Sequence, residues 1–251
     1  MIMKTIFRFT LLMFIICMTS CNNKKDEPTP MVTISFNQQI VSGNSMTRST
    51  TNEFLDIIEK QTPDYVNVTL KNLDLDKTYT CKSNETITIP IGNYEISASK
   101  STNSSKDVIG TSGIMYSSPI LGMNKINYTI THNTKLITLN VHYSCYAVFA
   151  LIDECKTCVA YYGSKDVDFY KNGKYYVAYF NYYESRGMDI RLTPYDDSTE
   201  FITTTYNFST TYDVNKVFAE YGKYYVIHPQ KVDKSNCGFN INLIDMIEGN
   251  I

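Results

Sequence analysis

The chain alternates apolar and polar residues with a period of two over many short stretches, which is the pattern of β-strands that bury one face. Turn-forming residues separate these stretches at short intervals, and this spacing favours an antiparallel sandwich. In the first half, the predicted strands are Val32 to Phe36, Tyr65 to Leu70, Thr78 to Lys82, Thr86 to Ile89, Glu95 to Ser99, Ile126 to Thr131 and Leu136 to Tyr143.

One segment of the first half has a helical pattern instead. Asn52 can cap a helix over Glu53 to Gln61, in which Phe54, Ile57 and Ile58 share a face. Pro63 disfavours a helical conformation for the residue before it. The sequence therefore predicts a short helix between the first two strands.

The second half keeps the β pattern. Its clearest turn is Asn172-Gly173, a dipeptide typical of tight hairpins, which separates Asp168 to Lys171 from Lys174 to Phe180. Asp213 can cap a helical turn over Val214 to Tyr221. The other predicted strands are Tyr146 to Ile152, Cys158 to Tyr162, Met188 to Leu192, Glu200 to Tyr206, Tyr224 to Ile227 and Phe239 to Leu243.

Met1 to Cys21 forms a separate unit at the start. Lys4 and Arg8 precede the apolar run Phe9 to Ile16, which is far shorter than the roughly 20 residues that span a bilayer. The small residues before Cys21 resemble a bacterial lipobox, in which the cysteine is diacylated and becomes the new N-terminus. We expect residues 1–20 to be a lipoprotein signal peptide and Cys21 to carry a lipid anchor. The alternative is an ordinary cleaved signal.

Residues 21–30 are polar, charged and proline-bearing, and such a composition predicts a flexible tether rather than a packed core. The cluster Lys24-Lys25-Asp26-Glu27 is similar to the export signal of surface-exposed lipoproteins in the Bacteroidetes. The alternative is a merely soluble linker. We expect a protein anchored by lipid to the outer membrane and facing the cell exterior.

Composition agrees with a β-rich extracellular protein, because the chain has 21 tyrosines and no tryptophan. Without the two basic residues of the signal, 21 basic residues face 25 acidic ones, and no long basic run remains. This balance argues against a nucleic acid partner. Length and strand spacing predict an all-β protein of two antiparallel β-sandwich domains, residues 31–140 and 141–251, with one or two short helices.

The chain has seven cysteines, of which Cys17 leaves with the signal and Cys21 carries the lipid. An odd number remains, so at least one is unpaired unless it bonds another chain. Cys155 and Cys158 form the only CxxC, with strand-like flanks that lack the helix N-terminus of a thioredoxin-type motif. A zinc site would need further ligands such as His142 and Cys145. We expect free thiols or a local Cys155–Cys158 disulfide at a hairpin tip, and the pairing of Cys81, Cys145 and Cys237 stays open.

The stretch Thr88 to Ile96 (TIPIGNYEI) reads as strand, turn and strand, because Pro90 fixes φ and Gly92 permits a positive φ before Tyr94. Together with Cys21, its tether and the helical segment, this stretch resembles the fimbrillin-like (Mfa-like) surface lipoproteins of the Bacteroidales. The resemblance covers residues 18 to about 140, and the second half only by class. It implies transthyretin-like or Ig-like sandwiches.

The resemblance also implies a non-catalytic role in adhesion or pilus assembly, with other pilus or surface proteins as partners. In that family a subunit donates a strand into a neighbour's open sandwich, and some members are first cut after an arginine near the N-terminus. Arg48 is the residue here that could play that part. Its alternative interpretation is a solvated loop residue. The chain is short for a main pilus subunit.

A run of tyrosines offers a second hypothesis. Alternation over Tyr175 to Tyr183 places Tyr175, Tyr179 and Tyr183 on one face. If that face is exposed, it could stack on sugar rings or form a protein interface. The alternative function is therefore a glycan-binding surface lipoprotein that serves polysaccharide uptake. If the strand is instead covered on both sides, its tyrosines are core residues.

No catalytic motif is present. The three histidines are scattered, and the acidic pair Asp166 and Asp168 is interpreted as solvated rather than as a glycosidase pair. Its spacing is also wrong for a calcium loop. We therefore predict a protein that is not an enzyme and that needs no metal or cofactor.

Overall fold

The computed structural model describes residues 29–41, 53–99, 106–109, 113–162, 165–182, 188–195, 201–209, 216–231 and 246–250. Strands dominate these residues, and their one helix is α2 (Glu53–Gln61). Among the same residues, no helix has the length and apolar character needed to cross a membrane.

The first sandwich consists of two four-stranded sheets, with strand orders β4-β1-β10-β8 and β3-β2-β5-β9 in the numbering given at the end of this paragraph. Every second residue of β2 and of β10 is buried, as the alternating sequence requires. Ile34, Leu70, Ile96 and Leu139 are among the side chains that fill the space between the sheets. The strands are β1 (Met31–Ile40), β2 (Asn67–Asn72), β3 (Lys77–Lys82), β4 (Ile87–Pro90), β5 (Gly92–Ser99), β8 (Leu121–Gly122), β9 (Ile126–Ile130) and β10 (Leu136–Tyr143).

The second sandwich pairs a larger sheet, β22-β20-β11-β15-β7-β6 with β14 beside β15, with the sheet β13-β12-β16-β18-β19. A small ladder joins β17 to β21. The strands are β6 (Lys106–Ile109), β7 (Gly113–Tyr116), β11 (Tyr146–Leu151), β12 (Cys155–Tyr162), β13 (Lys165–Asp168), β14 (Tyr170–Asn172), β15 (Tyr175–Tyr182), β16 (Met188–Pro194), β17 (Phe201–Ile202), β18 (Thr204–Ser209), β19 (Val217–Phe218), β20 (Lys223–Ile227), β21 (Gln230–Lys231) and β22 (Met246–Asn250).

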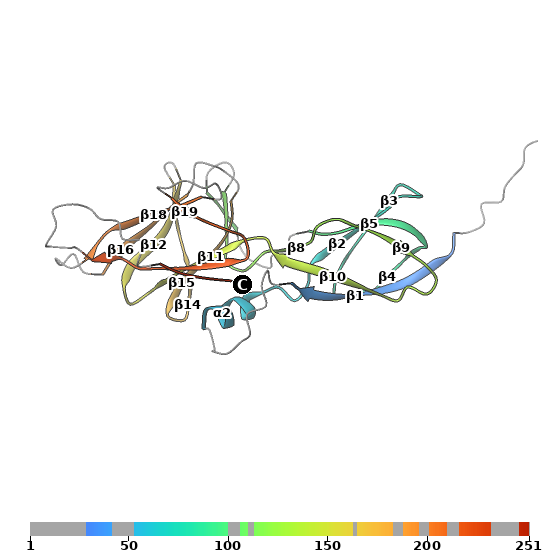
Figure 1. Ribbon diagram of the computed structural model, residues 1–251, viewed down its shortest axis with the longest axis horizontal. Coiled ribbons are helices and arrows are strands. Elements are labelled where there is room, and N and C mark those ends of the chain that lie inside the picture. Colours follow the sequence, from blue (N-terminus) through green and yellow to red (C-terminus); the bar gives the residue numbers. More distant parts are fainter. Residues whose placement is uncertain are drawn as a thin grey trace, which may run out of the picture.

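Most neighbouring strands are antiparallel, as predicted, but β1–β10, β11–β20 and β18–β19 are parallel. Figure 1 shows the two sandwiches end to end along the long axis of the molecule, with the first at the right and the second at the left. Helix α2 lies below the end of the second sandwich that is nearer the first. The sequence-based prediction of a mostly β chain with two sandwiches and a short helix agrees with this architecture.

The predicted boundary between residues 140 and 141 does not separate the two sandwiches. Strand β10 runs through it to Tyr143, and β7 pairs with β15 of the second sandwich. Helix α2 also packs on that sheet, through the ring of Phe54. Pairing and burial are long-range interactions, so local sequence gives no sign that these segments cross over.

The central strands β11, β15 and β20 of the larger sheet are buried on both faces. Alternate residues of β15, such as Tyr176 and Phe180, join the core against the smaller sheet. Tyr175 and Tyr179 face the opposite core, which includes Ile58 of α2. A sheet covered on both sides carries apolar residues at successive positions, as in the YYVAYF run of β15.

Two segments of the second sandwich, the β14–β15 hairpin and residues 214–221, were predicted from local sequence as turns. The hairpin between β14 and β15 is confirmed, but its two-residue loop is Gly173-Lys174, one residue later than the predicted Asn172-Gly173, because Asn172 pairs with Tyr175. Gly173 takes the first central position of the loop with a φ of 59°. The helical turn predicted over residues 214–221 is wrong for its described part, because Val217–Phe218 forms β19 beside β18. Pairing with β18 supplies the backbone hydrogen bonds that the isolated segment would otherwise take from a helical turn.

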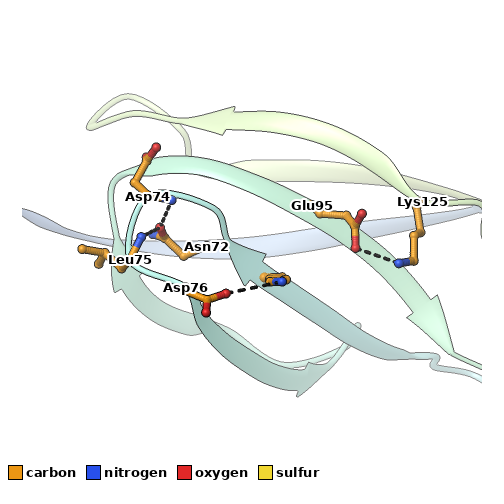
Figure 2. Close-up of polar contacts among 7 residues, drawn as sticks. Asn72, Asp74, Leu75, Asp76, Glu95 and Lys125 are labelled. Atoms are coloured by element: carbon orange, nitrogen blue, oxygen red, sulfur yellow. Dashed lines mark hydrogen bonds and ion pairs between the residues drawn. The ribbon is translucent and has the colours of Figure 1, made fainter.

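The turn between β4 and β5 requires its glycine. Gly92 has a φ of 147°, and a Cβ placed on it would lie 2.6 Å from Oδ2 of Asp74. That same carboxylate oxygen accepts a 2.7 Å hydrogen bond from the Asn93 backbone N–H. Asp74 in turn is positioned by Asn72, whose Oδ1 accepts from the N–H groups of Asp74 and Leu75 (Figure 2). The predicted Pro-x-Gly-x-Tyr turn is thus tied to the β2–β3 turn.

Gly92→Ala is expected to lower the free energy of unfolding by about 2–3 kcal/mol, because it adds backbone strain and displaces the Asp74 carboxylate. The matched control is Gly173→Ala, which also has a positive φ but has no heavy atom within 4 Å of the added Cβ. That control should cost only about 1 kcal/mol. Urea denaturation of both variants measures the difference, and equal losses would contradict the role given to Asp74.

Candidate functional site

The candidate site is the space occupied by β1, here called the β1 slot. Residues 31–34 pair with β4 in antiparallel register, and residues 35–40 pair with β10 in parallel register. The strand therefore bridges two neighbours, and its removal would leave an unpaired edge on each of them. Unpaired edges are templates for the addition of another strand. The alternating pattern predicted this strand only over Val32 to Phe36.

The inward face of the first part of β1 is apolar. Ile34 is 1% exposed, and Val32 and Phe36, one on each side of it, pack partly buried against the same core. On the outward face, the hydroxyls of Thr33 and Thr88 lie 2.8 Å apart. The slot thus takes three alternate apolar side chains.

The far end of the slot is polar. Ser83, which lies in the turn after β3 and is 5% exposed, donates its hydroxyl to Oε1 of Gln38 over 2.9 Å. The same Oγ accepts a 2.9 Å hydrogen bond from the Val66 backbone N–H. Gln38 follows Val32, Ile34 and Phe36 in the two-residue alternation of β1. Sequence reasoning missed this pair. If the alternation is extended beyond Phe36, however, it places Gln38 on the inward face.

Two predicted site residues lie beside this slot in the sequence but outside the described residues. Arg48 lies in the segment 42–52 that joins β1 to α2, and Cys21 lies ahead of β1. Processing at Arg48 and lipidation of Cys21 both stay predictions.

The tyrosines that were predicted to form a ligand platform are buried where the structure describes them. Tyr175 and Tyr179 are 3% and 0% exposed, so they offer no surface to a sugar ring, and the platform prediction is wrong for these two residues. Their hydroxyls bind α2 instead: Tyr175 donates to the Glu53 carboxylate, and Tyr179 donates to Oε1 of Gln61 over 2.6 Å. Tyr183 lies outside the described residues.

Aromatic packing reinforces the position of α2. The ring of Phe54 lies 5.1–5.5 Å from the rings of Phe149, Tyr175 and Tyr224. Helix α2 follows β1 in the chain and returns to β2 in the first sandwich, so its contacts connect the two sandwiches. The tyrosines that suggested a ligand platform are thus an internal docking surface for a helix.

Glu53 is the charged residue among the contacts of α2 with Tyr175 and Tyr179. The hydrogen bond from Tyr175 holds the pKa of Glu53 below its usual range, and the Lys174 ammonium, with Nζ 2.9 Å from Oε2, lowers the pKa further. Burial raises the pKa of Tyr175, and that of Tyr179 rises well above its usual value for the same reason.

Glu53→Gln is expected to lower stability at neutral pH and to have no effect in acid. Since the pKa of Glu53 is lower in the folded chain than its ordinary 4.5, its contribution is fully present above that pH and is lost as the pH falls through the folded pKa. Urea midpoints of wild type and variant, measured across this range, should converge below pH 4.5. The control Asp56→Asn removes an exposed carboxylate from the same helix and should lower the urea midpoint at neutral pH much less than Glu53→Gln does.

The CxxC cysteines are buried and free. A bulge between Cys155 and Thr157 shifts the register of β12, and both thiols lie in the same core. Burial raises the pKa of Cys155 to about 12 and that of Cys158 well above its usual value. A redox-active cysteine needs a lowered pKa, so this pair does not have the properties of a thioredoxin-type site. The local disulfide considered for the pair is not formed in the structure.

The other cysteines and the acidic pair are not gathered into a site. Cys81 is a free thiol, Sγ of Cys145 accepts a 3.3 Å hydrogen bond from the Ile120 backbone N–H, and Cys237 lies outside the described residues. Asp166 and Asp168 are exposed on β13, and Asp166 lies 3.8 Å from the Arg191 guanidinium. Within the described part of the chain, no three His, Cys, Asp or Glu side chains are grouped as metal ligands.

No protein-family model matches the sequence, and no curated protein does. Solved structures do match. A candidate cell adhesion protein from Bacteroides uniformis is 10% identical, with 80% of this chain and 92% of that chain covered and a TM-score of 0.43. One from Bacteroides eggerthii is 9% identical, with 88% and 94% covered and a TM-score of 0.39. Candidate polysaccharide-binding proteins from Bacteroides thetaiotaomicron are 9% identical, with 82% and 99% covered and a TM-score of 0.38. All three of these solved chains come from Bacteroides and are covered over 92–99% of their own length.

Proposed function

We propose that this protein is a lipid-anchored, cell-surface component of adhesive or pilus-type assemblies, and that β1 is the strand exchanged during assembly. Lipidation at Cys21 holds the unprocessed chain to the outer membrane through the tether of residues 21–30. A cut after Arg48 then separates the anchor and β1 from the rest of the chain. The partner is a strand donated by another pilus or surface protein.

The position of β1 carries this proposal. It is the first strand of the described chain, it supplies Ile34 to the core, and it pairs with both β4 and β10. Arg48 lies after β1 and before the next element, α2. After a cut at Arg48, only non-covalent contacts would hold β1, and a competing strand could replace it.

Replacement of β1 by a donated strand would also keep the core of the first sandwich buried. Loss of β1 alone would expose the apolar side chains beneath Ile34 and leave two strand edges unpaired, which is unfavourable in water. A donated strand with apolar residues at alternate positions restores both the burial and the ladder hydrogen bonds. The assembled state therefore needs no new fold, only a strand from another chain.

Arg48→Ala tests the proposal in the native host. The wild-type protein should lose its N-terminal segment and appear in higher-order species, whereas the variant should stay full-length and unassembled. Intact mass and size-exclusion chromatography of material extracted from the cell surface measure the two outcomes. Arg186→Ala is the matched control, because it removes an arginine from the second half of the chain. Unchanged processing and unchanged assembly in Arg48→Ala would rule out the exchange of β1.

The glycan-binding alternative loses its main support. It depended on an exposed face made of Tyr175, Tyr179 and Tyr183, and the first two are covered by α2. We therefore do not propose polysaccharide uptake as the function.

A further inference from the structure

The register of β1 in its slot is not decided by the backbone ladder alone. Ladder hydrogen bonds repeat every two residues, so a strand that slips by two residues recovers the same backbone pairing and the same inward face. A slip by one residue is excluded more simply, because it would turn Ile34 toward solvent. What must be explained is the choice among registers that differ by two.

Ser83 distinguishes these registers chemically. Its backbone N–H donates to the Val66 carbonyl, and its Oγ accepts from the Val66 N–H, so the residue is held in one position and its hydroxyl proton points to the slot. In the observed register, Oε1 of Gln38 accepts that proton. A two-residue slip would bring Phe36 or Ile40 to the same place, and neither side chain can accept a hydrogen bond.

The cost of such a slip is that of a buried, unpaired hydroxyl. Ser83 is 5% exposed, so solvent does not replace the lost partner. Leaving a buried donor without an acceptor costs more than the bond itself contributes, because the group has already lost its hydration. The apolar positions of the slot select by volume, whereas Ser83 selects by hydrogen-bonding capacity.

We infer that Ser83 is the specificity-determining residue of the β1 slot. A strand that occupies the slot must present apolar side chains at three alternate positions and a hydrogen-bond acceptor at the fourth. This inference rests on the proposed function, since it defines which donated strands can replace β1. The partner class is an extended peptide segment with this pattern and with Gln, Glu, Asn or Asp at its fourth inward position.

Peptide exchange tests this inference. The full chain, with an inserted site for a sequence-specific protease within residues 42–52, is cut there and incubated with fluorescein-labelled peptides of residues 29–41. The native peptide and its Gln38→Glu form should bind alike, and the Gln38→Leu form should bind at least about fivefold more weakly. Gln39→Leu is the matched control, because it has the same composition as Gln38→Leu but changes an exposed residue. In a Ser83→Ala chain the Gln38→Leu and Gln39→Leu peptides should bind equally.

The outcomes separate this inference from the proposed function. Equal binding of the Gln38→Leu and Gln39→Leu peptides to the wild-type chain would overturn the role of Ser83 and leave strand exchange standing. If no peptide binds, strand exchange itself is contradicted, and a double-mutant cycle in the uncut chain decides about Ser83. If the effect of the double variant Ser83→Ala/Gln38→Leu on the unfolding equilibrium constant differs by about fivefold from the product of the two single effects, the pairing is supported. Additive effects would overturn it.

Discussion

Ile34→Ala should lower the free energy of unfolding by about 2–5 kcal/mol, because it removes buried methyl groups and leaves a cavity under β1. Ile34 is 1% exposed and lies at the point where β1 passes from pairing with β4 to pairing with β10. The surrounding strands are held by their own ladders and cannot close fully over the lost volume. Urea denaturation, followed by far-UV circular dichroism, measures the loss.

Asn37→Ala is the matched control for this prediction. Asn37 is an exposed residue of the same strand, three positions further on, and its replacement should change stability by no more than about 0.5 kcal/mol. Similar effects of the two variants would mean that β1 contributes little to the core. A strand of that kind could not act as the plug of an otherwise open sandwich, so the proposed function would also be weakened.

Phe208→Ala should cost about 3–5 kcal/mol in the core of the second sandwich. The ring is 0% exposed, lies parallel to that of Tyr146 at 5.9 Å between centroids, and meets Tyr225 edge-on at 5.4 Å. Aromatic pairs of this geometry add to the free energy of area burial, so the variant loses both contributions. Loss of near-UV circular dichroism at a lower urea concentration than in wild type measures the effect.

The control for Phe208 is another phenylalanine of the same sheet. Phe218 lies on β19, beside the end of β18, and is 41% exposed. Because much of its ring already contacts water, Phe218→Ala should cost far less than Phe208→Ala. Equal losses would show that the second core is not organised around the Tyr146–Phe208–Tyr225 group.

Local patterns predicted several elements well. Helix α2 occupies the predicted residues Glu53–Gln61, and β10 occupies the predicted residues Leu136–Tyr143. In both cases the signals lie within the segment itself: a cap, a proline and a helical apolar face for α2, and strict alternation for β10. A capping residue likewise predicted a helical turn at residues 214–221, but parallel pairing with the preceding strand β18 makes Val217–Phe218 a strand.

The tyrosines of β15 show the limit of the approach most clearly. Alternation correctly divides Tyr175 and Tyr179 from Tyr176 and Phe180, but alternation cannot say whether either face meets water. That answer depends on α2, which lies more than a hundred residues earlier in the chain and donates Phe54 to the face. The Ser83–Gln38 pair is hidden for the same reason, since 45 residues separate its partners.

By itself, the sequence determined the β class, the one described helix, most strand positions and the candidate residues Cys21 and Arg48 near its start. Those features depend on local periodicity, capping and composition, which a single segment carries. Only the tertiary structure decided that β1 bridges β4 and β10, that Ser83 meets Gln38, and that α2 covers the tyrosines. Each of these results from contacts between distant segments, whose free energy depends on which surfaces are buried together and not on the residues of either segment alone.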